Sequence, residues 1–153
     1  MLKAIFLGLL LGFAILQGPA ARAAGLCAAH ANDDTLRPLP ASLVPQAQKA
    51  FALHGITKAQ IQQMTMMRCM GGKPYGCFIG ANLPCGKANP ARRLPAAKEW
   101  CAKNPEIDFI PAYISGHDSA YQWRCQSGQA VPEGPPASID ARGFFKQYWR
   151  PLH

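Results

Sequence analysis

Six cysteines in a chain of 153 residues constrain this protein more than any other feature of its sequence. The sequence contains neither a C-x-x-C pair nor a C-x-x-C-H haem attachment site, so the usual cysteine signatures of metal or haem binding are missing. An even number of cysteines at irregular spacing in a small exported chain predicts three structural disulfides. We therefore expect no metal site and no cofactor, and we expect disulfides among Cys27, Cys69, Cys77, Cys85, Cys101 and Cys125.

The first 23 residues have the pattern of a secretory signal peptide. Lys3 supplies a positive start, an uncharged apolar run follows over residues 4–16, and the A-x-A motif at 21–23 provides a cleavage site. The apolar run is shorter than the about 20 residues that a membrane-spanning helix needs. Leu26 precedes Cys27, where a lipoprotein signal requires a small residue. We therefore expect a periplasmic or secreted protein that keeps no transmembrane anchor after cleavage.

The rest of the chain divides into an extended N-terminal arm at 24–41 and a single domain at 42–153. Glycine and proline each occur 14 times, which favours a loop-rich fold over a coiled coil or a plain helical bundle. Apolar residues make up 49% of the chain, enough to form a core. The expected class is α+β, a small antiparallel sheet with two or three short helices, stabilised by disulfides.

Local patterns place the elements of this domain. Helices are expected where an apolar face coincides with end signals, and strands where apolar residues alternate. The glycine pair before Lys73 marks the clearest hairpin. We expect one sheet that carries the hairpin and a second pair of strands, with two helices covering it. The predicted elements are helices at 43–53 and 95–103, a hairpin at 64–79, strands at 107–114 and 121–125, loops at 80–93 and 128–136, and a closing aromatic helix at 144–149.

The sequence does not choose among the possible cysteine pairings. Two bridges are favoured by position. A disulfide between Cys85 and Cys101 would attach the second helix to the loop before it, and a bridge from Cys27 would hold the N-terminal arm. The motif R-C-x-x-G occurs twice, at Arg68 and Arg124, and indicates two similar strand-to-turn corners, each held by a disulfide.

The strongest candidate for catalysis is the segment Gly116-His117-Asp118-Ser119. A histidine beside a carboxylate and hydroxyl groups could act as a general base. Adjacent residues seldom face one another, and the chain has no G-x-S-x-G nucleophile elbow. A turn in which Asp118 and Ser119 bond to the backbone explains the segment better, so His117 and Asp118 are weak catalytic candidates.

Positive charge provides the leading functional signal. The formal net charge is +8, and basic residues concentrate in the middle of the chain. Outside the cytosol such a surface favours lipid headgroups, cell-wall polymers or acidic proteins rather than nucleic acid, although a solvated face that keeps the protein in solution is the alternative. The predicted binding residues are Lys73, Tyr75, Arg92, Arg93, His117 and Arg124.

Several runs carry a resemblance to other proteins. They are R-C-M-G-G-K-P-Y-G-C-F-I-G-A-N-L-P-C-G-K-A-N, W-C-A-K-N-P, I-P-A-Y-I-S-G-H-D-S-A-Y-Q-W-R-C and D-A-R-G-F, within residues 68–145. With these runs the chain resembles a group of small exported, cysteine-rich proteins of Gram-negative bacteria, a resemblance that brings no activity with it. A looser likeness, of topology only, is to periplasmic lysozyme inhibitors of the small-barrel type, from which this chain departs in its additional helix and its central prolines.

These observations favour an exported, non-enzymatic binding or interaction module of the cell envelope with an anionic partner. An inhibitor of a cell-wall hydrolase is the sharper alternative. A small secreted hydrolase that uses His117 and Asp118 is the alternative from another functional class.

Overall fold

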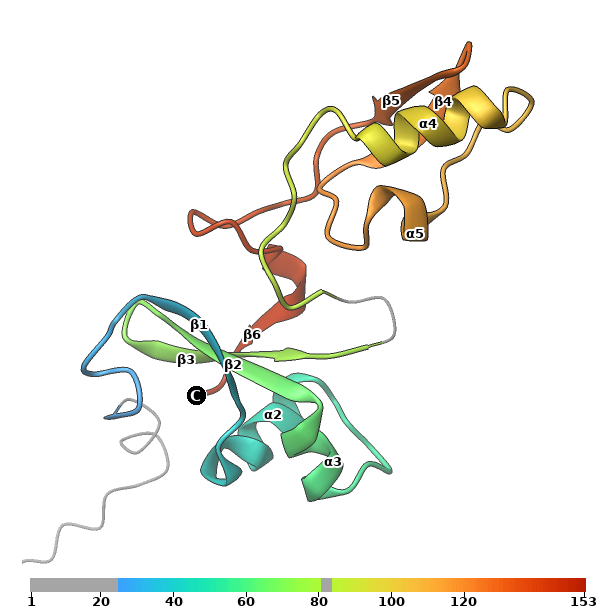
Figure 1. Ribbon diagram of the computed structural model, residues 1–153. Helices are drawn as coiled ribbons and strands as arrows, with labels where there is room; N and C mark the ends of the chain where they lie inside the picture. The colour runs from blue at the N-terminus through green and yellow to red at the C-terminus, as the bar shows by residue number, and fades with distance from the viewer. Residues whose placement is uncertain (1–24, 81–83) are drawn as a thin grey trace, which may run out of the picture.

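The computed structural model describes residues 25–80 and 84–153, so the predicted signal peptide lies outside the described residues. The described chain forms two lobes joined by two connecting segments (Figure 1). Both lobes contain a small antiparallel sheet and short helices, which confirms the predicted disulfide-stabilised α+β class. The first lobe contains β1 (Asp33–Pro38), α2 (Val44–Ala50), α3 (Lys58–Gln63), β2 (Thr65–Met70), β3 (Lys73–Phe78) and β6 (Trp149–Pro151). The second contains α4 (Pro95–Lys103), α5 (Ala112–Ser115), β4 (Gln122–Gln126) and β5 (Gln129–Glu133).

The first lobe is built on an antiparallel sheet with the strand order β1-β2-β3-β6. Its centre is the hairpin of β2 and β3, which confirms the hairpin predicted at 64–79. Gly71 and Gly72 form the turn with φ of +55° and +73°, a region that L side chains rarely adopt. The glycine pair therefore fixes the register in which Met66 faces Cys77.

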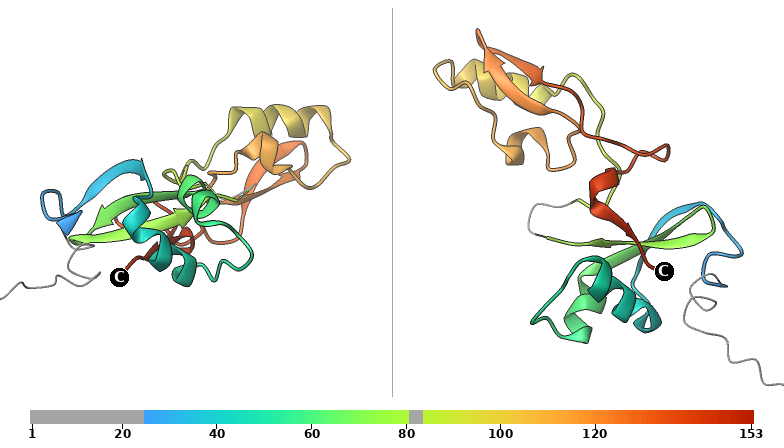
Figure 2. Two further views of the ribbon diagram at one scale, coloured as in Figure 1. Left: turned by 90° about the horizontal axis from the view of Figure 1, so that it is seen from below. Right: turned by 180° about the vertical axis from the view of Figure 1, so that it is seen from behind.

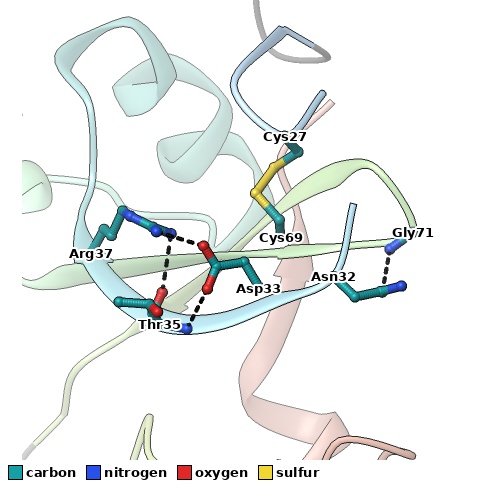
Figure 3. The surroundings of a disulfide bond; sticks show 7 residues. All are labelled: Cys27, Asn32, Asp33, Thr35, Arg37, Cys69 and Gly71. Atoms are coloured by element: carbon teal, nitrogen blue, oxygen red, sulfur yellow. Dashed lines mark hydrogen bonds and ion pairs between the residues drawn. A yellow bond between two sulfur atoms is a disulfide. The ribbon is translucent and has the colours of Figure 1, made fainter. Parts of the chain in front are cut away.

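The segment predicted as an extended arm contains β1, which pairs with β2 along one edge of this sheet. A disulfide between Cys27 and Cys69 attaches the beginning of the arm to the same strand (Figure 3). The amide of Gly71 donates a hydrogen bond to the Asn32 side chain at 3.0 Å, shown in the same view. The expected bridge from Cys27 to hold the arm is therefore confirmed.

Helices α2 and α3 lie on one side of the four-stranded sheet (Figure 2). Helix α2 follows a short 3₁₀ turn at Ala41–Leu43 and ends at Ala50, earlier than predicted. Helix α3 is not among the predicted elements; it begins with a capping box between Thr57 and Gln60. The apolar faces of both helices form the largest core cluster, with Leu39, Leu43, Val44, Ala47, Leu53, Ile61, Met67 and Leu152.

The opposite face of this sheet is covered by the C-terminal segment. Phe144 and Trp149 pack there in an edge-on arrangement, with ring centroids 5.7 Å apart, beside the Cys77–Cys85 disulfide. The predicted closing helix at 144–149 is wrong, because only Lys146–Tyr148 form a 3₁₀ turn before β6 begins. Residues from Trp149 onwards pair with β3, and that pairing requires an extended backbone.

The second lobe packs α4 against the β4–β5 hairpin. Helix α4 has the predicted bounds, with Pro95 at its first position. The inward residues of β4, Trp123 and Cys125, alternate with exposed neighbours as the sequence predicts. They form a small core with Ala97, Cys101 and Ile110, and the Cys101–Cys125 disulfide passes through it.

Two strand predictions in this lobe are wrong. Residues 107–114 contain an isolated bridge between Phe109 and Arg124, followed by α5. Pro111 lacks an N–H for strand pairing and stands at the N-cap of α5. The loop predicted at 128–136 contains β5, since Ser127 and Gly128 adopt positive φ and return the chain along β4. The expected single sheet is therefore two separate sheets.

The predicted bridge between Cys85 and Cys101 is also wrong. Cys85 pairs with Cys77, with a Cα–Cα distance of 5.8 Å, and Cys101 pairs with Cys125 at 5.4 Å. Cys85 packs with Cys77, Phe144 and Trp149 on the sheet of the first lobe, whereas Cys101 faces β4 in the second lobe. All six cysteines are nevertheless consumed in three disulfides, as predicted. Two of these disulfides hold the two R-C-x-x-G corners, at Cys69 and Cys125.

Candidate functional site

The six residues predicted as a binding face are divided between the two lobes. Lys73 is exposed at the start of β3, and Tyr75 is half-buried on the same strand beside Trp149. The structure places the other four predicted residues, Arg92, Arg93, His117 and Arg124, in or next to the second lobe, where all four are exposed.

Arg92 and Arg93 lie together at the edge of an open groove of about 730 Å³. We call this hollow the basic groove. One wall is the beginning of α4 with its approach, and the other wall is β5. Its lining residues are Arg92, Arg93, Leu94, Pro95, Lys98, Gln129, Ala130, Val131 and Pro132. Lys98 joins the two arginines because one helical turn separates it from Leu94.

The three cations of the basic groove carry no compensating acid. Within the described ranges, none of Arg92, Arg93 and Lys98 forms an ion pair. Glu99, the acid next in sequence to Lys98, is paired with Lys103 at 2.6 Å. The groove therefore presents three positive charges over a floor of apolar side chains.

Arg92 is also held in place by an aromatic ring. Its guanidinium lies over the ring of Tyr121, 5.3 Å from the centroid. The Tyr121 ring in turn packs edge-on against Trp123, with the two centroids 6.4 Å apart. This contact restricts the Arg92 side chain before a ligand binds. Less side-chain entropy is therefore lost on binding.

His117 lies at a second hollow, of about 440 Å³, between the second lobe and the chain that leads back to β6. We call it the junction pocket. Three separate segments contribute to it: the α5–β4 region, the loop after β5, and the segment before β6. Its lining residues are Ala112, Ser115, Gly116, His117, Ser119, Ala120, Tyr121, Gln122, Pro135, Ala137, Phe145, Gln147 and Tyr148.

The weak catalytic pair, His117 and Asp118, lies on the surface of the second lobe. Both residues are exposed, and no hydrogen bond joins their side chains in the described part of the chain. The Asp118 carboxylate instead lies over Gly116, 2.6 Å from the position a Cβ would take there, and Gly116 has φ +87°. The Ser119 side chain bonds to the Tyr121 backbone, as the turn interpretation expects, whereas the Asp118 side chain makes no backbone hydrogen bond within the described residues.

The Ser119 hydroxyl is occupied by structural hydrogen bonds. It accepts from the indole Nε1 of Trp123 at 2.8 Å and from the Tyr121 amide at 3.3 Å, and it donates to the Tyr121 carbonyl at 3.0 Å. These bonds use the donor of the hydroxyl and both of its acceptor sites, and they hold the Ser119 side chain in one position.

Neither Arg68 nor Arg124 contributes to the basic groove. Arg68, a basic residue of the central region, is completely buried beneath Phe144 and Trp149. Arg124 is exposed on β4, where its guanidinium donates a hydrogen bond to the Gln126 side chain at 3.5 Å. Of the basic residues in the middle of the chain, the structure therefore brings together Arg92, Arg93 and Lys98.

Lys98 and the β5 wall are the parts of the groove that the sequence did not indicate. Lys98 lies in the first turns of α4, whereas Arg92 and Arg93 precede the helix, so helical periodicity does not relate their positions. The β5 wall falls within a proline- and glycine-rich stretch that predicts a loop.

No group of three or more metal-ligating side chains occurs among residues 25–80 and 84–153. In the same ranges, every helix is too short or too polar to cross a bilayer. Comparisons of the chain with protein-family models, with curated proteins and with solved structures found no match. Its function is therefore inferred from the side chains themselves.

Proposed function

We propose that this protein is an exported, non-enzymatic binding module of the cell envelope that holds an anionic ligand in the basic groove. The observation that carries the proposal is the set of three cations, Arg92, Arg93 and Lys98, which surround one groove without an acidic partner among the described residues. Unpaired cations around a concave surface attract anions and raise their local concentration.

The apolar residues of the groove indicate which kind of anion fits it. Leu94, Pro95, Ala130, Val131 and Pro132 supply apolar surface between the cations. A ligand that places a carboxylate or phosphate among the cations and an apolar portion on the floor would use both features. Lipid headgroups with their first acyl carbons and acidic peptide segments both have this composition.

Export is the second component of the proposal. Three disulfides are typical of proteins that fold outside the cytosol, and they agree with the predicted signal peptide at 1–23. The envelope of a bacterium offers anionic lipids, anionic polymers and acidic proteins as partners.

Direct titration of the oxidised protein tests the anionic site. Two anionic probes distinguish the sources of the charge: phosphatidylglycerol vesicles and an oligoglutamate peptide, with phosphatidylcholine vesicles and an oligoglutamine peptide as neutral counterparts. The expected result is binding to at least one anionic probe. The double variant Arg92→Gln/Arg93→Gln should weaken it by about tenfold at low salt, and the difference should shrink as salt screens the charges.

A charge-matched control separates the groove from the overall net charge. Lys49→Gln/Lys58→Gln removes the same two positive charges from helices of the first lobe. Unchanged affinity in this control supports a local site. An equal loss in both double variants, or a lack of binding to either anionic probe, contradicts the proposal.

A further inference from the structure

We propose that the junction pocket is a binding site for an uncharged sugar residue. This inference does not depend on the basic groove, because the pocket uses different residues and a different chemistry. The pocket volume of about 440 Å³ lies in the range typical of small-molecule sites. Three separate segments converge on it, so a ligand there contacts the second lobe and the chain that leads to β6.

The first observation is a set of polar side chains without internal partners. Within the described residues, the side chains of Ser115, His117, Gln122, Gln147 and Tyr148 make no hydrogen bond to the rest of the protein. All five line the same hollow. Their hydrogen-bonding groups are therefore available to a ligand, in contrast to the Ser119 hydroxyl beside them.

The chemistry of these groups matches hydroxyls. A glutamine amide can donate and accept at the same time, and neighbouring sugar hydroxyls also donate and accept. Gln122 comes from β4 and Gln147 from the 3₁₀ turn before β6, and both line the same pocket. The tyrosine and serine hydroxyls and the imidazole of His117 add further donors and acceptors.

The charge of the pocket points to a neutral ligand. No aspartate, glutamate, lysine or arginine lines the junction pocket among the residues that the structure describes. The three cations of the basic groove are absent from this lining, although Arg92 lies over the ring of Tyr121, which does contribute to the pocket. An anionic ligand therefore has no partner of opposite charge in the pocket lining.

Apolar groups complete the match to a pyranose ring, which has C–H faces as well as hydroxyls. Phe145 is buried at the pocket, and Ala120, Pro135 and Ala137 provide small apolar contacts. The Phe145 and Tyr148 rings pack on each other with centroids 5.3 Å apart. Aromatic surface edged by hydroxyl and amide groups suits a ligand with one apolar and one polar face.

The pocket walls are held together by backbone hydrogen bonds. The Ala137 amide donates to the Ala120 carbonyl at 2.7 Å, and the Ala120 amide donates to the Asn89 carbonyl at 2.8 Å. The Lys146 amide donates to the Ser138 carbonyl at 2.9 Å. The segments that carry the polar side chains are therefore positioned before a ligand arrives, which reduces the entropic cost of binding.

NMR titration of the ¹⁵N-labelled, oxidised protein tests this site. The probes are glucose and N-acetylglucosamine as free sugars, and cellobiose and chitobiose as fragments of glycans. Each sugar is titrated up to about 50 mM, because a site that provides a few hydrogen bonds is expected to bind with a millimolar dissociation constant. We expect saturable shifts of amides at 115–122 and 145–148 with at least one sugar, and tighter binding of a disaccharide would indicate a glycan.

Matched glutamine variants test the assigned contacts. Gln122→Ala/Gln147→Ala should weaken sugar binding by about tenfold. Gln126→Ala changes an exposed glutamine of the same strand that does not line the pocket, and it should bind as the unmodified protein does. Unchanged affinity in the double variant overturns the proposal.

Two further outcomes also overturn the inference. The first is the absence of saturable shifts with all four sugars. The second is saturable binding of a neutral blocked dipeptide, N-acetyl-alanyl-alanine amide, at the same amides when no sugar binds. The Arg93→Gln variant, which lacks one cation of the basic groove, should retain full sugar binding, so failure of the anionic site and failure of this site can be distinguished.

Discussion

The guanidinium of Arg68 forms an ion pair with the carboxylate of Asp140, although 72 residues separate them in the sequence. Arg68 is completely buried, with its guanidinium 3.8 Å from the centroid of Phe144 and 4.6 Å from that of Trp149. Its Nε and Nη1 atoms have no hydrogen-bond partner, so Asp140 is its one ionic contact within the described chain. The pair attaches the segment that returns from the second lobe to the central sheet of the first.

Asp140→Asn should destabilise the protein by about 3 kcal/mol, because it leaves the buried positive charge of Arg68 without a counter-ion. Asparagine preserves the size of the side chain and an oxygen that can accept from the backbone amides of Arg142 and Phe144. Urea unfolding measures the difference. The control is Asp34→Asn, whose partners Lys87 and Arg142 are exposed, and which should cost less than about 1 kcal/mol. Equal losses in the two variants would contradict a special role for Asp140.

The same carboxylate should make stability depend on pH under acidic conditions. Burial acts to raise the pKa of Asp140, but hydrogen bonds from the Phe144 amide, from Arg68 and from the Arg142 amide outweigh it and lower the pKa below 3.8. A carboxylate with a depressed folded-state pKa stabilises the protein above its unfolded pKa, and this stability is lost as pH falls through the folded pKa. Thermal unfolding of the unmodified protein and of Asp140→Asn from neutral pH to about pH 2 measures the effect.

The difference in melting temperature between these two proteins should be constant at neutral pH and should shrink in acid once Asp140 is protonated. A difference that stays constant down to the lowest pH would indicate that the charge of Asp140 does not matter. Hydrogen bonds from the Thr35 amide and from Arg37 lower the pKa of Asp33 to about 2, so this half-buried carboxylate stays ionised over most of the same range.

The elements that the sequence predicts correctly are those with local signals. Gly71 and Gly72 mark the central hairpin, and Pro95 and Asn104 mark the ends of α4. The edge strand β6 could not be predicted, because its strand conformation depends on pairing with β3, whose residues are far away in the sequence. Strand β5 was not predicted for another reason. Pro132 and the nearby glycines suggest a loop unless the partner strand β4 is known.

The candidate sites show the same division. Arg92 and Arg93 are adjacent in sequence, so their proximity follows from the sequence alone. Their groove also requires β5, which the sequence did not reveal. The junction pocket combines residues from 112–122, 135–137 and 145–148, and a periodic pattern within any one of these segments carries no information about the other two.

Ser119→Ala should destabilise the second lobe by about 1 to 2 kcal/mol, because it removes the acceptor of the Trp123 indole and of the Tyr121 amide. Unfolding followed by tryptophan fluorescence measures the change. Ser115→Ala is the matched control, since Ser115 lines the same pocket and its hydroxyl has no hydrogen-bond partner in the described residues. The control should leave stability within about 0.5 kcal/mol of the unmodified protein. A Ser119 variant of unchanged stability would reopen the question of a chemical role for this hydroxyl.

Thr57→Ala should cost about 1 kcal/mol of stability, because the Thr57 side chain caps α3. Its hydroxyl accepts from the Gln60 amide at 3.3 Å, while the Gln60 side chain accepts from the Thr57 amide at 3.0 Å. Thr57→Ser retains the hydroxyl and should keep most of the stability. Denaturant unfolding of the two variants compares them directly, and equal stability of the alanine and serine variants would show that the cap contributes little.

The disulfide between Cys101 and Cys125 should determine whether the second lobe stays folded. Its core contains few large side chains, and the bridge links α4 directly to β4 through that core. Cys101→Ala/Cys125→Ala should lower stability by about 3 kcal/mol. Hydrogen exchange should then show protection lost over α4, β4 and β5 but retained in the β2–β3 hairpin, because the first lobe has a separate and larger core. Simultaneous loss of protection in both lobes would show that they unfold as one cooperative unit.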